Sequence, residues 1–202
     1  MKKILTLLPM LLIALAGMAA TSASALLQRS AAKIKGAESL HVSYTATADG
    51  NTTAGTLVLQ GDMFTLSSPG MMSWYDGQSQ WTYSTQIGEV NIITPTPEEV
   101  SQINPFAILK SFSTGYTPSL LKSASGSSTV KLVAKNKKSD ITQAEITIDD
   151  RTSYPTRVVL TMANKQKVTI NIKDVKTGKK LPVANFRYSP ARFPGVNVVD
   201  LR

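Results

Sequence analysis

The chain has 202 residues, 22 Lys and Arg against 13 Asp and Glu, and 42% apolar residues, the composition of one ordinary globular domain with a basic excess. A mean hydropathy of −0.03 and a charged fraction of 17% argue against a disordered chain and against a multi-span membrane protein. The sequence has no cysteine, which excludes disulfides, thiolate metal sites, thiol nucleophiles and a lipid-modified N-terminal cysteine.

Residues 1–25 have the pattern of a cleavable secretory signal peptide. Two lysines precede an apolar run over residues 4–16, and Ala23-Ser24-Ala25 provides an A-x-A cleavage site. The apolar run is shorter than the roughly 20 residues of a membrane-spanning helix, which disfavours the alternative of an uncleaved anchor. We therefore expect an exported chain of residues 26–202, a single domain with a formal charge of +7 once the two leading lysines are removed.

A short amphipathic helix is predicted at the start of this domain, followed by strands. Leu27, Ala31 and Ile34 have helical spacing, and a glycine suited to a C-terminal cap follows, which predicts a helix over residues 26–36. Apolar and polar residues then alternate with a period of two, and turns such as Asp49-Gly50-Asn51 separate the runs. Strands are predicted at residues 39–47, 56–60, 64–66, 72–74, 81–83 and 90–92.

Residues 95–121 interrupt this alternation and predict two short helices. Thr96-Pro97-Glu98-Glu99 has the spacing of a capping box with proline at the first helical position. Asn104-Pro105 repeats the cap signal before a second helix, which is expected to end at Gly115. An apolar stripe runs along that second helix and consists of Phe106, Leu109 and Phe112.

The remaining strands are predicted at residues 129–134, 144–148, 158–162, 168–172 and 186–188. The total is ten or eleven short antiparallel strands with about three helical pieces. A single sheet of that size must curl or close, and a curled sheet needs a cover on its concave face. The mid-chain helices are the available lid. The predicted fold class is therefore mainly β with an α lid (α+β).

Signals for enzyme chemistry are weak. His41 is the only histidine, so any histidine-dependent triad or two-histidine metal site would have to use it, and its place in a strand favours a structural role. The acidic pairs Glu98-Glu99 and Asp149-Asp150 are explained by a helix start and a turn. No phosphate loop, G-x-S-x-G elbow or H-E-x-x-H motif occurs. We predict no enzyme, no metal and no cofactor.

The basic residues gather in turns, notably at 135–138 and 176–180, without interleaved aromatic residues. This arrangement argues against nucleic acid as a partner and favours solvated turns, with docking on an anionic membrane or an acidic partner as the alternative. Methionine and aromatic residues are instead abundant on the predicted strand faces. They either pack the core or line a cavity for a flexible hydrocarbon ligand.

Several short segments, in a fixed order, carry a family resemblance. Residues 74–83 (WYDGQSQWTY) contain a DGxxxW hairpin, residues 104–109 (NPFAIL) lie in the mid-chain helical region, and residues 198–202 (VVDLR) close the chain. With the opening helix and residues 39–44 (SLHVSY), they span nearly all of the exported domain. In these features the chain resembles the outer-membrane lipoprotein carrier protein family, LolA.

The resemblance implies an incomplete antiparallel β-barrel of about 10–11 strands whose helical lid covers an apolar cavity. It implies a monomeric periplasmic chaperone that shields the acyl chains of lipoproteins and carries them from the inner to the outer membrane. The implied partners are acylated lipoproteins, an inner-membrane lipoprotein-releasing ABC transporter and an outer-membrane receptor. The alternative is a periplasmic lipid-binding or lipid-sensing regulatory module on the same fold.

One feature departs from the family pattern. An arginine that is thought to hold the lid in proteobacterial members has no counterpart in residues 60–67. The ligand-binding residues are predicted to come from four strands and the lid. They are Met72, Trp74, Trp81, Tyr83, Phe106, Leu109, Phe112, Val158, Leu160, Ile170 and Ile172.

Overall fold

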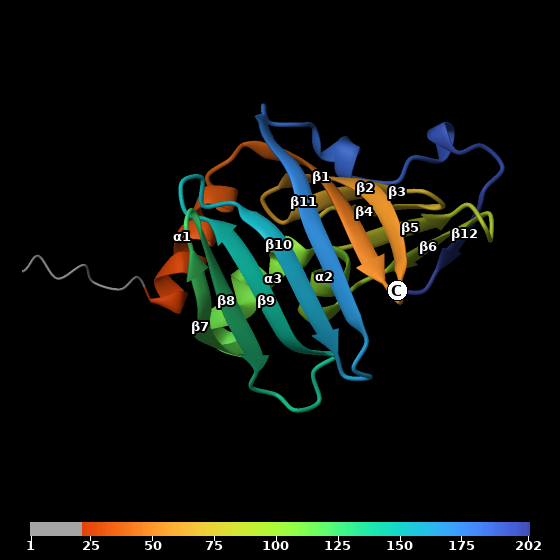
Figure 1. Cartoon of the computed structure of the whole chain (residues 1–202). Coiled ribbons are helices and arrows are strands. Elements are labelled where there is room, and N and C mark those ends of the chain that lie inside the picture. The colour runs from red at the N-terminus through yellow and green to blue at the C-terminus, as the bar shows by residue number, and fades with distance from the viewer. Residues whose placement is uncertain (1–21) are drawn as a thin grey trace, which may run out of the picture.

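The computed structural model describes residues 22–202, which form one 12-stranded sheet and three α-helices (Figure 1). The predicted signal peptide lies outside the described residues as far as residue 21, whereas its predicted cleavage site, Ala23-Ser24-Ala25, forms the first turn of α1. The helices are α1 (Ala23–Lys35), α2 (Pro97–Ile103) and α3 (Ile108–Gly115), with 3-10 turns η1 (Pro105–Ala107), η2 (Val183–Phe186) and η3 (Pro190–Arg192).

The strands follow one another mostly through short hairpins. They are β1 (Ser39–Ala48), β2 (Asn51–Gln60), β3 (Met63–Ser68), β4 (Met71–Tyr75), β5 (Gln80–Ser84), β6 (Glu89–Ile93), β7 (Tyr116–Ala124), β8 (Ser127–Ala134), β9 (Ile141–Asp149), β10 (Pro155–Met162), β11 (Lys167–Gly178) and β12 (Asn197–Asp200). Their order in the sheet is β12-β6-β5-β4-β3-β2-β1-β11-β10-β9-β8-β7. In the described chain β7 and β12 do not pair with each other, so the sheet stays open.

The sheet curls around the lid helices, which confirms the predicted class. Figure 1 shows α2 and α3 behind β9, β10 and β11, with α1 beside the β7 end of the sheet. The opening helix, the two mid-chain helices and ten strands occur where the sequence predicts them. The architecture is thus an incomplete antiparallel barrel with a helical lid.

Three elements differ from the prediction. β7 was not predicted, because Pro118 and a register shift between Leu120 and Lys122 break its alternation. The predicted strand at residues 186–188 is instead the end of η2 and the loop after it. β12 pairs with β6 in parallel, which local patterning does not reveal because the partner lies about 100 residues away.

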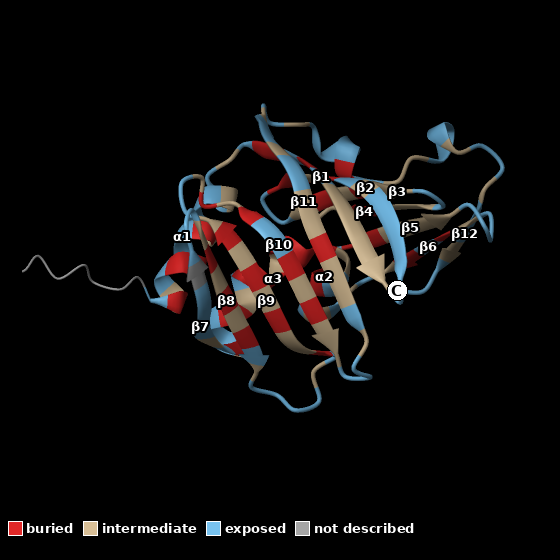
Figure 2. Ribbon diagram, viewed as in Figure 1, coloured by how far each residue is buried: buried red, intermediate tan, exposed pale blue. Residues whose placement is uncertain are grey.

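Two apolar clusters fill the concave side. The first lies between β8–β11 and the helices α1 and α3, and its centre includes Leu132, Ile146 and Ile148, none of which is exposed. The second lies between β1–β3 and the segment α2–η1 and includes Phe64 and Phe106. Along β8, β9 and β10 buried residues alternate with more exposed ones (Figure 2). One face of each strand is therefore committed to the interior.

Candidate functional site

An apolar cavity of about 400 Å³ lies between the concave face of the sheet and the lid. This main cavity falls within the roughly 300–1,000 Å³ typical of small-ligand sites. None of its lining side chains carries a charge. They are Tyr44, Ala46, Thr53, Leu57, Leu66, Ser68, Pro69, Met71, Gln102, Ile103, Pro105, Phe106, Val168, Ile170 and Ile172.

The lid side of the cavity is positioned by two helix caps that the sequence predicts. The Thr96 hydroxyl accepts a hydrogen bond from the Glu99 amide at 3.3 Å, and the Glu99 carboxylate accepts one from the Thr96 amide at 2.7 Å. Hydrogen bonds from Thr96 therefore hold the pKa of Glu99 below its ordinary range. Asn104 accepts a bond from the Phe106 amide at 3.1 Å, which begins η1 and turns Phe106 into the interior.

Polar tethers join both ends of the lid to the sheet. The Glu98 carboxylate on α2 accepts hydrogen bonds from the amides of Asp140 (2.7 Å) and Ile141 (3.4 Å), in the loop before β9 and at its start. On α3, the Lys110 ammonium donates to the Gly61 carbonyl oxygen at 3.0 Å and pairs with Asp62 in the β2–β3 turn. These polar contacts are mostly solvent-accessible and add to the apolar packing of Phe106, Leu109 and Phe112, which are buried in the two clusters.

The Lys110 contact bears on the missing family arginine. No arginine lies in residues 60–67, but the turn in that segment supplies a carbonyl and a carboxylate to a cation on the lid. In this chain the cation of the contact belongs to the lid, and its acceptors belong to the β2–β3 turn.

The predicted ligand-binding residues fall into three groups. Phe106, Ile170 and Ile172 line the main cavity. A second group is buried in the first apolar cluster instead and consists of Leu109, Phe112, Val158 and Leu160.

The third group lies on the opposite face of the sheet. Leu57 and Leu66 face the cavity, and in the strand register Leu66 stands opposite Ser73, which leaves Trp74 on the other face. Because paired residues share a face, Trp81, Tyr83 and Met72 also lie there. The prediction that these four side chains bind ligand in the cavity is therefore corrected: Met71 and Ser73 are the β4 residues on the cavity side, while Met72 and Trp74 lie on the outer face.

Residues 179–196, which we call the C-terminal arm, pack on the outer face of β3, β4 and β5. Trp74 packs edge-on against Tyr188 and Phe193, with ring centroids 5.8 and 5.5 Å apart. The Arg187 guanidinium of the arm donates to the carboxylate of Asp76 at 2.8 Å. Burial alone would raise the pKa of Asp76, but hydrogen bonds from the Ser79 and Gln78 amides and from Arg187 outweigh it, so the pKa lies below its ordinary range. The aromatic group therefore anchors the arm.

The sequence analysis missed several cavity residues, although the alternation of side chains along the strands could have identified them. Tyr44 and Ala46 line the cavity from β1, and both belong to the alternating apolar face of the first predicted strand. Tyr44 stands directly opposite Gly55 on β2. A Cβ at Gly55 would come within 2.5 Å of the Tyr44 hydroxyl oxygen and 2.8 Å of a backbone oxygen. Gly55 therefore makes room for the tyrosine in the cavity wall.

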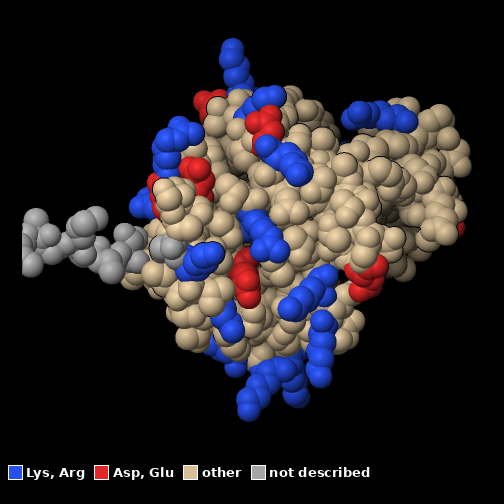
Figure 3. Space-filling view, viewed as in Figure 1, with Lys and Arg blue, Asp and Glu red and all other residues tan. Residues whose placement is uncertain are grey.

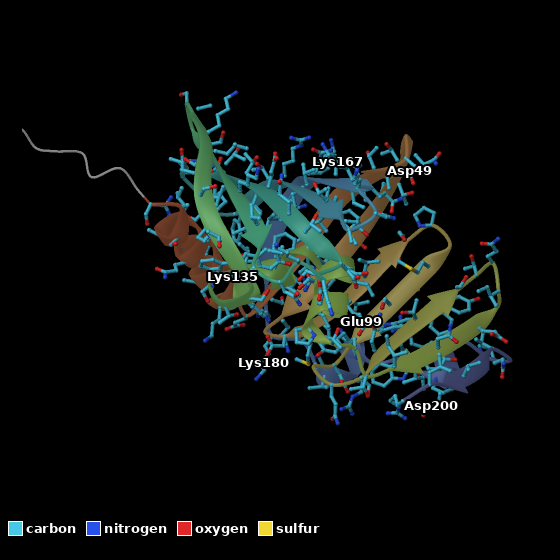
Figure 4. All side chains as sticks on the ribbon, turned by 90° about the horizontal axis from the view of Figure 1, so that it is seen from below. Asp49, Glu99, Lys135, Lys167, Lys180 and Asp200 are labelled. Atoms are coloured by element: carbon cyan, nitrogen blue, oxygen red, sulfur yellow. The ribbon has the colours of Figure 1, made fainter. Side chains whose placement is uncertain are left out.

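Charges lie around the cavity and not in it. Figure 3 shows Lys and Arg outnumbering Asp and Glu on the viewed face, with several at its lower edge. Seen from below, Glu99 on α2 lies between the two halves of the curled sheet, while Lys167 and Asp49 lie near strand tips (Figure 4).

In the described residues, no three His, Asp or Glu side chains are grouped so that they could hold a metal ion. The described helices include none of the length and apolarity that a membrane span requires.

Comparisons with known proteins agree with this architecture. The chain is similar in fold to an uncharacterised conserved protein from Thermus thermophilus (TM-score 0.59, 11% identity, 87% of this chain and 96% of that one). It is also similar to a putative outer membrane lipoprotein-sorting protein domain from Vibrio parahaemolyticus (TM-score 0.51, 12% identity, 82% of this chain and 96% of that one). A third similar structure is a DUF1329 family protein from Desulfovibrio piger (TM-score 0.51, 10% identity, 85% of this chain and 98% of that one). No curated protein sequence matches it.

The sequence profile of the family described as outer membrane lipoprotein carrier protein LolA matches residues 15–166, which is most of the chain. That family consists of carrier and binding proteins. The chain therefore belongs to the LolA family, as a divergent member.

Proposed function

We propose that this protein is a periplasmic chaperone that holds the acyl chains of lipoproteins in its main cavity and carries them from the inner to the outer membrane. The observation that carries the proposal is an uncharged cavity under a helical lid, in a member of a lipoprotein carrier family. An inner-membrane ABC transporter would supply the cargo and an outer-membrane receptor would accept it. We propose that residues 1–25 direct export and that the carrier acts as a monomer.

The energetics require such a cavity. Burying acyl carbon contributes about 0.8 kcal/mol per methylene, so an acylated protein does not leave a membrane for water unaided. Aliphatic and aromatic side chains such as Ile170, Ile172 and Phe106 offer the chain an apolar surface. Because these walls have no charged group, binding is non-directional and tolerates different cargoes.

Release requires that the bound state be only modestly favoured. Phe106, which is 4% exposed, packs into the second apolar cluster and against the cavity. Ligand and lid residues therefore compete for the same apolar surface, which lowers the net affinity. The few polar tethers of α2 and α3 can then set how often the lid opens.

Filling the cavity tests the proposal. Ala46 is half-buried on β1 and lines the main cavity, so Ala46→Trp should occupy the ligand space and abolish binding of a triacylated lipoprotein while the chain remains folded. Thr47→Trp, at the next position on the opposite face of the same strand, is the matched control. Equal lipoprotein binding by Ala46→Trp and wild type would contradict the proposal.

The alternative function is a lipid-sensing regulatory module on the same fold. It predicts that the cavity binds lipid but that the protein does not extract a lipoprotein from a membrane. An extraction assay with membranes that contain acylated lipoproteins therefore distinguishes the two functions.

A further inference from the structure

A second cavity of about 420 Å³ lies on the other side of Phe106. We call it the side cavity. Three elements enclose it: the last turns of α1, the β2–β3 turn, and the segment η1–α3. Its lining includes Ala31, Ala32 and Ile34 of α1 and Leu109 of α3. Leu109 is the predicted ligand-binding residue that lines this space and not the main cavity.

The side cavity and the main cavity share one side chain. Phe106 lines both, and it is the only residue common to the two linings among the described residues. Phe106 therefore lies where two spaces of similar size adjoin. Since it lies on the lid, movement of the lid that displaces the ring would connect them.

The charged residues of the side cavity mark its mouth. Lys110 and Asp62, which pair with each other, have side chains 48% and 77% exposed, and Lys35 is also exposed. Phe106 and Leu109 are buried and Ala31 and Ile34 are partly buried, while Ala32 and the charged groups reach solvent. An occupant with an apolar tail and a polar end matches this distribution.

We propose that the side cavity is a binding site for a second hydrocarbon chain of the same ligand, which enters beside Phe106. The inference rests on the proposed function, because it takes acyl chains as the ligand of the main cavity. A cargo with more than one acyl chain needs more apolar volume than the main cavity holds, and the side cavity about doubles it. The Lys110–Asp62 pair at the mouth would then respond to whether the side cavity is filled.

The test measures how many molecules of the fluorescent fatty acid cis-parinaric acid each chain binds, by fluorescence titration and by native mass spectrometry. Wild type should bind two molecules per chain. Ala32→Trp, at the side cavity, should bind one, as should Ala31→Phe, which places a ring deeper in the same space. Gln28→Trp is the control on α1: it is exposed, outside the lining, and should bind two.

The outcomes separate this inference from the proposed function. If wild type binds one molecule, and Ala46→Trp abolishes that binding while Ala32→Trp and Ala31→Phe do not, the side cavity is no hydrocarbon site but the main cavity remains one. If Ala46→Trp and Ala32→Trp each abolish all binding, the two spaces are one site, which overturns a separate second site. If wild type binds no fatty acid and no lipoprotein, the proposed function itself fails.

Discussion

Removal of the Glu98 carboxylate should loosen α2 on the sheet, although Gln102 still donates a hydrogen bond to Asp140 at 3.1 Å. In Glu98→Ala the 2.7 Å bond from the Asp140 amide is lost, and with it the longer bond from Ile141. A hydrogen bond to a charged group contributes about 1.5–3 kcal/mol, and the 3.4 Å bond adds little. Because Glu98 is partly exposed, the lower part of that range, about 1.5–2 kcal/mol, applies. Since 1.4 kcal/mol is a factor of ten, lid opening should become about 10–30-fold more frequent.

Amide hydrogen exchange measures this directly. The Val100 and Asn104 amides donate to Thr96 and Val100 carbonyls within α2, and both should exchange about 10–30-fold faster in Glu98→Ala. Exchange at Ile146, in the centre of β9, should be unchanged, which shows that the effect is local. Glu98→Gln keeps an acceptor oxygen without the charge and should have a smaller effect. Exchange at Val100 within twofold of wild type in Glu98→Ala would refute the tether.

Three further outcomes are expected. Thr96→Ala removes the hydroxyl that caps α2 and should lower the free energy of unfolding by about 1 kcal/mol, measured by urea denaturation; an unchanged midpoint would contradict the capping role. The folded pKa of Asp76 is lowered from 3.8, so its stabilising contribution is full above about pH 4 and is lost as the pH falls through the folded pKa. In Asp76→Asn the free energy of unfolding should therefore fall less steeply as the pH is lowered below about 4. The same steepness as in wild type would show that Asp76 does not contribute to the acid sensitivity of the fold. Trp74→Ala should cost about 3–5 kcal/mol in urea denaturation yet leave fatty-acid affinity of the folded protein unchanged, whereas a loss of affinity would return Trp74 to the ligand site.

Much of the fold could be predicted from local sequence. Alternation along residues 39–47 and 168–172 is strong because one face of each strand packs against the apolar clusters and the cavity. The capping box at Thr96 determines the start of α2 by its own hydrogen bonds. β12 could not be predicted in this way, because its pairing with residues 89–92 depends on the path of the C-terminal arm.

The cavity was harder to predict than the fold. A strand with bulky residues on both faces gives no local sign of which face is concave, and a shift of one residue exchanges the two. On β4 the inward position is occupied by Ser73, and Trp74 is buried by the C-terminal arm. Burial of Trp74 is thus real, but its cause is a segment about 115 residues further along the chain. Phe106 lines the cavity because the Asn104 side chain accepts a hydrogen bond from its amide and begins η1 there.

Extraction of a lipoprotein tests the central claim most directly. The protein, produced with its own N-terminal segment and purified from the periplasm of a bacterial host, is added to energised spheroplasts, and the soluble fraction is examined for a mature acylated lipoprotein. The carrier function predicts a soluble one-to-one complex that Ala46→Trp does not form. If the lipoprotein stays in the membrane at every concentration of a folded, lipid-binding protein, the carrier function is wrong.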